Sequence, residues 1–485
     1  MAQNIINKLD KKFLLNIIIF ISFTSFFYFW DAKIQIFKFD FRILILIVLP
    51  FFFKEFFKFY KIPLIIVVFL STSTLFGLIF NQEIIFNFKT FIKILAVYYI
   101  MIFSLNYKDK IFEILPYIVK FFILFFTILT FTEFLNILPK ESNDPSSTCA
   151  YFADISSLSN INIFKENSHF GLIAAGTFIY YIFQIDKKNL KSAIFLYFPC
   201  ILFLSFIYSS ATLKAGIVIS CFLFIILNFK KKYFINLILL SLLLIVNIVP
   251  FLYLEECVSR VKRLNITNVI ERNVQINEIF NLIPEDVRFK KTNLEIYNEL
   301  INANRIGDYD KINQLKKMYE NTSTEKQLSK INEINKIIIS SEGKYQYPNL
   351  TVDVYRNALL ITLLSIFNEP LGVGFDHYKY SFIKYTPIIF LHSDVSPEIL
   401  MLNVEDGRAN IFKISTEFGI FSIILYLFLI YFLFSKKFSV QHKAFLLPTI
   451  ITQMISAAGY FNGGFIICLC LILSLILNKK KTKNL

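Results

Sequence analysis

Residues 234–273 read FINLILLSLLLIVNIVPFLYLEECVSRVKRLNITNVIERN, and the character of the chain changes in the middle of this stretch. Its first half is apolar over about 20 residues, which is the length that crosses a bilayer as a helix. The chain is then polar and charged from Glu255 to Leu350. Further apolar runs of similar length lie on both sides of this segment. The sequence therefore predicts an all-α polytopic membrane protein with one large aqueous loop.

The composition also indicates a membrane protein. Hydrophobic residues make up 56% of the 485 residues, above the share of about 45–50% that is usual in soluble domains. The formal net charge is +15, but the lysines gather in short loops between apolar runs. We therefore expect the basic charge to reflect membrane topology, and we expect no nucleic-acid partner.

About twelve apolar runs are candidate transmembrane helices, nine before the polar segment and three after it. They are residues 13–30, 39–53, 63–80, 86–105, 116–136, 169–185, 192–208, 211–228, 234–254, 411–434, 443–461 and 464–478.

Short loops on the side of the N-terminus are rich in lysine and poor in acidic residues, as at 230–232, 436–437 and 479–481. Cytoplasmic loops carry such an excess, so we expect both termini to lie in the cytoplasm. The long polar loop is then extracytoplasmic. Minimal cytoplasmic loops and the absence of a glycine-rich phosphate loop exclude ATP-driven transport.

Three regions follow from this topology. Residues 1–254 hold helices 1–9, residues 255–410 form the large periplasmic loop, and residues 411–485 hold the last three helices and a cytoplasmic tail. Within the loop, residues 271–340 are predicted to form a charged helical insertion, and residues 354–367 a helix lying in the membrane interface. Cys149 and Cys257 both fall on the outer side, where an oxidising compartment permits a disulfide.

Ionisable residues at membrane depth or its outer edge are costly and tend to be functional. Such residues cluster around the outer face, and Lys93 lies deep in the span 86–105. A cationic site there suits an anionic, lipid-borne substrate, because arginine binds phosphate oxygens bidentately. The four histidines show no metal-ligand spacing, so we expect no metal and no cofactor. The candidate residues are Glu166, His169, Lys214, Arg356, His392, Arg408, Asn410 and Glu417.

Five segments carry a family resemblance: FKENSHFG (164–171), SSATLKAG (209–216), RNALLITLLSIFNEPLGVGFDHYKYSF (356–382), GRANIFKISTEFGIFSIILYLFLIY (407–431) and GYFNGGFI (459–466). Together with the topology they resemble the O-antigen polymerase and O-antigen ligase superfamily of bacterial cell-surface polysaccharide assembly. The resemblance implies a metal-independent, inverting glycosyltransferase of the inner membrane. It would polymerise polyprenyl-diphosphate-linked repeat units of an O-antigen or capsule-type polysaccharide. A chain-length regulator and a flippase are its expected partners.

The resemblance also suggests roles for the candidate residues. Arg356 is expected to bind the diphosphate, with Arg408 and Lys214 assisting. A base or an acceptor-positioning group is expected among Glu166, His169 and Glu417, and the further substrate contacts are Asn410 and His392. Structural roles remain open for each: Glu417 could hydrogen-bond a neighbouring helix, and His169 could cap its span.

Two alternative functions remain. A ligase that transfers glycan to a lipid A core would share the fold and the donor. Ala409 weakens that reading, because family members commonly have histidine before the asparagine that is Asn410 here. A flippase or secondary transporter would have a similar number of spans but usually shows two related halves, which this sequence does not.

Overall fold

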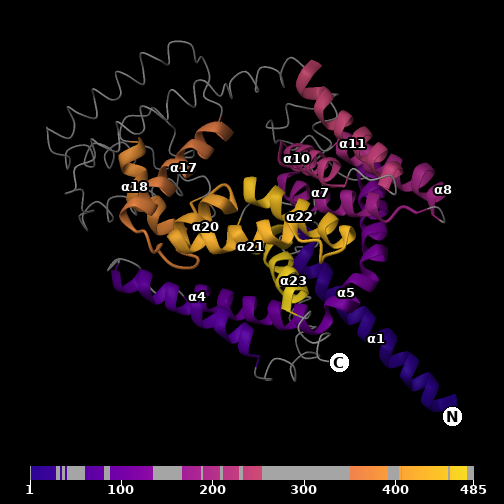
Figure 1. The fold of residues 1–485 in the computed structure, drawn as a ribbon, viewed down its shortest axis with the longest axis horizontal. Coiled ribbons are helices and arrows are strands. Elements are labelled where there is room, and N and C mark those ends of the chain that lie inside the picture. Colours follow the sequence, from indigo (N-terminus) through magenta and orange to yellow (C-terminus); the bar gives the residue numbers. More distant parts are fainter. Residues whose placement is uncertain are drawn as a thin grey trace.

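The computed structural model describes residues 2–28, 33–34, 39–40, 60–80, 88–134, 167–186, 189–207, 211–228, 233–253, 350–390, 404–405, 407–456 and 459–477. These residues are almost entirely helical, which confirms the predicted class (Figure 1). A two-residue strand pair, β1 (Lys33–Ile34) with β2 (Phe39–Asp40), is the one piece of β-structure among them.

The helices before the polar segment fall close to the predicted spans. They are α1 (Ala2–Phe27), α4 (Lys61–Phe80), α5 (Phe88–Phe134), α7 (Asn167–Phe183), the run of α8 (Leu190–Ser192), the π-helix η4 (Ala193–Tyr197) and α9 (Phe198–Ile207), then α10 (Ala211–Leu227) and α11 (Phe234–Tyr253).

The helices after the polar segment begin with two that flank a glycine-rich loop. They are α17 (Leu350–Asn368), α18 (Tyr378–Phe390), α20 (Asn410–Phe418), the 3-10 turn η6 (Gly419–Phe421), α21 (Ser422–Phe434), α22 (Val440–Ile455), the 3-10 turn η7 (Asn462–Gly464) and α23 (Phe465–Leu477). The predicted helix at 354–367 is present as α17, whereas α18 was not expected from the sequence.

Three stretches of the described chain are long and apolar enough to cross a membrane: Phe88–Thr132, Leu190–Ile207 and Asn410–Phe434. Most of the other predicted spans coincide with shorter apolar helices, such as Thr212–Leu227 and Phe234–Val249. The structure thus supports a helical membrane protein. Length and composition identify three spans within the described residues, and the twelve spans stay a prediction.

The predicted loop between spans 86–105 and 116–136 is helical, so α5 runs without interruption over 47 residues. Its charges favour the helix, because Lys110 lies 2.5 Å from Glu113 in an i,i+3 pair. Helix α5 is nevertheless not straight. Phe103 and Phe122, which a straight helix would hold about 28 Å apart, both contact the end of α1.

The contacts that show this bend are between aromatic rings. The ring centroid of Phe103 lies 6.2 Å from that of Phe26, and the ring centroid of Phe122 lies 4.3 Å from that of Tyr28. Pro116 lies between the two contacting residues, and an internal proline removes a helical hydrogen bond and bends the helix. The two halves of α5 therefore approach the same end of α1.

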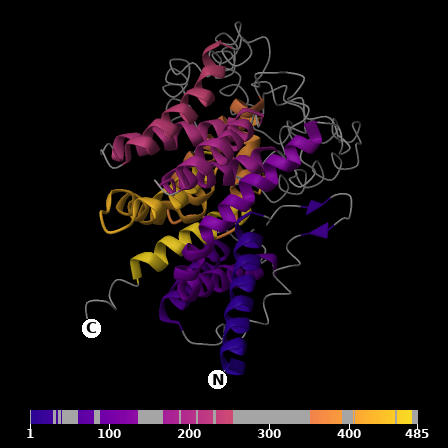
Figure 2. The same cartoon turned by 90° about the vertical axis from the view of Figure 1, so that its right-hand side faces the viewer.

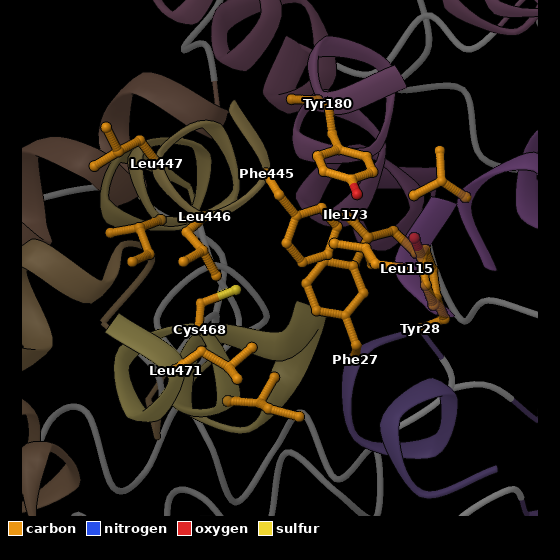
Figure 3. Packing of buried hydrophobic residues seen from close by; sticks show 14 of the residues in the cluster. Phe27, Tyr28, Leu115, Ile173, Tyr180, Phe445, Leu446, Leu447, Cys468 and Leu471 are labelled. Carbon is orange, nitrogen blue, oxygen red and sulfur yellow. The ribbon is translucent and has the colours of Figure 1, made fainter. Parts of the chain in front are cut away.

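The core is centred on α7, which packs against α22 and α10. Figure 3 shows Phe445 of α22 between Tyr180 of α7 and Phe27 of α1. The ring centroids are 5.5 Å and 4.8 Å apart, respectively. Gly176 lets α7 approach α22 closely, since an added Cβ there would lie 2.6 Å from the carbonyl oxygen of Phe445. Small residues at membrane helix interfaces allow such packing.

The two ends of the molecule differ in what they carry. The start of α1 lies at the bottom of both views and α11 lies at the top (Figures 1 and 2), while Figure 1 shows α17 and α18 on the left. Several predictions lie outside the described residues: most of the span 39–53, the charged helix 271–340, the Cys149–Cys257 pairing, and the candidate residues Glu166 and His392.

Candidate functional site

Four segments that are distant in sequence meet beside the start of α20. The guanidinium of Arg408 lies 5.2 Å from the ring centroid of Tyr355 on α17. The Tyr355 hydroxyl lies close to the Ser456 side chain at the end of α22. The Ser456 hydroxyl lies 2.7 Å from that of Thr212 at the start of α10. These contacts connect the SSATLKAG segment, the first turns of α17 and the turn before α20.

Arg408 sits on a strained turn. Its φ is +64°, which non-glycine residues adopt at a cost. Gly407, also at positive φ, lies against the ring of Tyr378, where an added Cβ would come within 2.9 Å of Cζ. The turn leads directly into Asn410, the first residue of α20, whose side chain is fully buried. Ala409, between Arg408 and Asn410, is the N-cap residue of α20, and its side chain makes no capping hydrogen bond.

The other predicted cations lie close to this meeting point in the fold. Lys214 is 1% exposed and lies two residues beyond Thr212 on α10. Arg356 follows Tyr355 on α17, and His169 lies in the first turn of α7. The starts of α7 and α10 are adjacent, because a Cβ on Gly171 would lie 2.8 Å from the backbone nitrogen of Leu213. For Arg356 and His169 the structure gives the helical position alone.

Glu417, the remaining predicted residue, is fully buried on α20. Its carboxylate accepts hydrogen bonds from the backbone N–H groups of Asp376 (2.9 Å) and Tyr378 (3.1 Å). The Tyr460 hydroxyl donates a third, at 2.6 Å. The Lys413 ammonium lies 3.5 Å from the same carboxylate, one helical turn away. Glu417 thus joins α20 to the loop before α18 and to the turn before α23.

The loop 370–378, with the sequence PLGVGFDHY, docks on the end of α20 through its backbone. The N–H of Gly374 donates to the carbonyl oxygen of Glu417 at 2.9 Å. Gly372 and Gly419 both have positive φ and face each other so closely that a Cβ on Gly372 would lie 2.7 Å from the nitrogen of Gly419. Glycine is required at both positions, for backbone conformation and for space.

Asp376 extends the ionic contacts from this loop to α5. Its carboxylate lies 2.5 Å from the Lys93 ammonium and 3.7 Å from that of Lys413. Lys413 also donates to the backbone carbonyl of Glu405, just before the Arg408 turn. Lys93, which lies deep in a predicted span, is thereby neutralised. Two cations and two carboxylates, counting Glu417, balance in a largely buried cluster.

His377 lies beside this cluster and is 7% exposed. Its Nδ1 is 2.7 Å from the carbonyl oxygen of Phe375. A carbonyl oxygen can only accept, so Nδ1 carries the proton and Nε2 holds a lone pair. Burial lowers the pKa of His377 below its ordinary value, which keeps the ring neutral near pH 7. Nε2 has no hydrogen-bond partner in the part of the chain that the structure describes.

A second polar cluster fastens α17 to α18. The Glu369 carboxylate lies 2.5 Å from the Lys384 ammonium and accepts hydrogen bonds from the Tyr385 hydroxyl at 3.0 Å and the Ser365 hydroxyl at 3.1 Å. Burial raises the pKa of Tyr385, so its hydroxyl keeps its proton and donates. This cluster fixes the position of the loop that carries Asp376 and His377.

Sequence reasoning identified Arg408, Asn410 and Glu417 but missed their neighbours. A signal existed for Lys413, which precedes Glu417 by four residues and so shares a helix face with it. Asp376 and Tyr460 lie inside two of the quoted motif segments. Nothing in the sequence showed that these segments touch.

Comparison with known proteins gives no further help: no family model, no curated protein and no solved structure matches this chain.

Proposed function

We propose that the protein is an integral-membrane glycan polymerase acting at the outer face of the bacterial cytoplasmic membrane. It transfers a growing glycan from its polyprenyl diphosphate carrier to the non-reducing end of a lipid-linked repeat unit. The bond between the anomeric carbon and the diphosphate oxygen breaks, and a glycosidic bond to the acceptor hydroxyl forms. The hydroxyl proton passes to a base, and the polyprenyl diphosphate leaves.

The observation that carries this proposal is the meeting of Arg408, Tyr355 and Ser456 with the start of α10. It brings together two of the motif segments on which the family resemblance rests, 209–216 and 407–431, with the residue that directly precedes a third, 356–382. Each of those segments carries a cation: Lys214, Arg356 or Arg408. Guanidinium groups suit a diphosphate because they keep their charge and offer paired donors.

The proposed topology has twelve spans, both termini in the cytoplasm and residues 255–410 outside. Two contacts support it. The Tyr60 hydroxyl and the Asn106 side chain are hydrogen-bonded at 2.9 Å, and the rings of Phe112 and His442 lie 4.1 Å apart. These residues belong to, or directly follow, lysine-bearing loops that the sequence assigns to the cytoplasmic side.

Glu166 and His169 remain the proposed sources of the base. Glu417 suits a different role, because its carboxylate oxygens already accept hydrogen bonds from two backbone amides and a phenol. We propose that Glu417 positions the loop 370–378 and, through Lys413, the turn that bears Arg408.

Deletion of the gene tests the function. A polymerase-deficient strain still has its ligase, so its lipid core should carry a single repeat unit in place of a ladder on a gel of surface polysaccharide. Bare core with finished polymer stranded on the polyprenyl carrier would indicate a ligase instead. Repeat units confined to the inner leaflet would indicate a flippase.

Arg408→Gly tests the proposed diphosphate contact. Glycine tolerates the φ of +64° better than arginine does, so this variant should insert and fold at least as stably as the natural protein. Its surface glycan should nevertheless shift from ladder to single repeat, and Arg356→Ala should do the same. A normal ladder in Arg408→Gly would remove this residue from the substrate site.

A further inference from the structure

Buried polar atoms without a hydrogen-bond partner gather at one place beside the candidate site. Within the described chain they include His377 Nε2, the Tyr378 hydroxyl, Arg408 Nε, and both Asn410 Oδ1 and Nδ2. Buried polar atoms are nearly always paired, since an unpaired one costs about 1–3 kcal/mol. Five such atoms from only four residues call for a common explanation.

The four residues belong to two short segments that are in contact. Gly407 packs against the ring of Tyr378 next to Cζ, the carbon that bears the hydroxyl. His377 precedes Tyr378, and Arg408 and Asn410 follow Gly407 within three residues. The backbone N–H of Tyr378 donates to Glu417 on α20, the helix that Asn410 begins. The unpaired atoms therefore belong to two segments that meet where α18 and α20 begin.

The chemistry of these atoms indicates what would pair with them. His377 Nε2 and Asn410 Oδ1 are acceptors, Arg408 Nε and Asn410 Nδ2 are donors, and the Tyr378 hydroxyl can be either. His377 is neutral because burial lowers its pKa, and burial likewise raises the pKa of Tyr378 so that it keeps its proton. Mixed donors and acceptors with only one charged side chain suit a ring of hydroxyl groups, each of which donates and accepts.

We propose that His377, Tyr378, Arg408 and Asn410 form a subsite that binds the hydroxyl groups of a sugar ring. This inference rests on the proposed polymerase function and deepens it, because it assigns His377 and Tyr378 to glycan binding. The subsite lies next to the turn whose Arg408 is proposed to contact the diphosphate, so it receives the sugar nearest that group. Arg408 Nε then bonds the sugar while the rest of the guanidinium remains available to phosphate oxygens.

The test uses the full-length protein in lipid nanodiscs and two probes. One probe is the lipid-linked repeat unit extracted from cells that lack this gene, and the readout is kcat/KM for polymer formation. The other is the soluble oligosaccharide released from that lipid by mild acid, and the readout is the rise in Tm that it causes. The variants are Tyr378→Phe, Asn410→Leu, His377→Leu and His377→Gln.

Loss of one hydrogen bond to the sugar should lower kcat/KM about five- to tenfold in Tyr378→Phe. The Tm of that variant without sugar should stay the same or rise, because the hydroxyl it removes is unpaired in the fold. Asn410→Leu should likewise lower kcat/KM without lowering the Tm measured in the absence of sugar. His377→Gln keeps an acceptor oxygen and should retain more activity than His377→Leu. All variants should show a smaller sugar-induced rise in Tm.

Tyr385→Phe is the matched control, since Tyr385 lies on the same helix but its hydroxyl donates to Glu369. This variant should lower Tm, because it removes a hydrogen bond made within the fold, whereas Tyr378→Phe should not. If Tyr378→Phe lowers Tm as this control does, the Tyr378 hydroxyl serves the fold and the proposed subsite is wrong. That conclusion holds even if the natural protein makes polymer. If the oligosaccharide raises Tm in a Tyr378-dependent manner but no polymer forms, the subsite holds and the polymerase proposal fails.

Discussion

At the scale of one residue, both oxygens of the buried Glu417 carboxylate already accept hydrogen bonds from neighbouring residues. One oxygen accepts from the N–H of Tyr378, and the other accepts from the N–H of Asp376 and from Tyr460. In Glu417→Gln the amide NH₂ must replace one of these oxygens and face a backbone N–H. One buried donor is then unsatisfied in either orientation, at a cost of about 1–3 kcal/mol.

We therefore expect Glu417→Gln to lower the Tm of the purified protein and to shorten or abolish the glycan ladder. Tyr460→Phe, which removes one of the accepted hydrogen bonds and no charge, should have a smaller effect. An unchanged Tm in Glu417→Gln, together with a lost ladder, would favour a direct role in proton transfer over the positioning role.

His377 gives a prediction for pH. Burial lowers the pKa of its folded state, and the backbone carbonyl of Phe375, Asp376, Lys413 and Lys93 are the neighbours that modify it. Below its ordinary pKa of about 6.5, the unfolded chain takes up a proton that the folded chain does not. The contribution of His377 to stability is therefore complete above that pH and is lost as the pH falls further. Tm measured from pH 8 to pH 5 should decline less steeply in His377→Gln than in the natural protein, and parallel curves would contradict the assignment.

At the scale of the element, the length of an apolar run predicted a helix well where polar segments bound the run on both sides. The runs 211–228 and 234–254 correspond to α10 and α11 almost residue for residue. The segment around Lys108 and Lys110 was expected to be a loop because it is charged. It is helical because lysine and glutamate are good helix formers, and because no glycine interrupts it.

The close contact of α7 with α22 leads to a prediction of its own. A Cβ on Gly176 would overlap the hydroxyl of Thr449 and press on the carbonyl of Phe445. Gly176→Ala should therefore destabilise the protein by about 1–3 kcal/mol, despite the better helix propensity of alanine. Thermal unfolding in detergent measures this loss.

Thr449→Ala is the matched change on the facing helix. It removes the overlapping hydroxyl, so the double variant Gly176→Ala/Thr449→Ala should be more stable than the sum of the two single effects. Strict additivity would mean that the two helices separate to accommodate the added methyl group.

For the whole molecule, the sequence could supply the parts of the site but not their arrangement. Arg408, Asn410 and Glu417 were singled out because ionisable and polar side chains near a membrane edge are costly. The partners of Arg408 and Glu417 come from elsewhere: Tyr355 from α17 and Tyr460 from the turn before α23. Long-range packing decides such contacts, and no periodicity or spacing within one segment reveals them.

The bend in α5 makes the topology testable. Because Phe103 and Phe122 both contact the end of α1, we propose that α5 crosses the membrane inward and then back outward, with its charged middle on the cytoplasmic side. Alkaline phosphatase fused after residue 145 or residue 300 should then be active, since it folds outside. A fluorescent protein fused after residue 109 or residue 485 should be bright, since it remains inside. Fusions at 109 and 145 that report the same side would contradict the two crossings of α5. A cytoplasmic signal at 300 would place the proposed glycan site on the wrong face of the membrane.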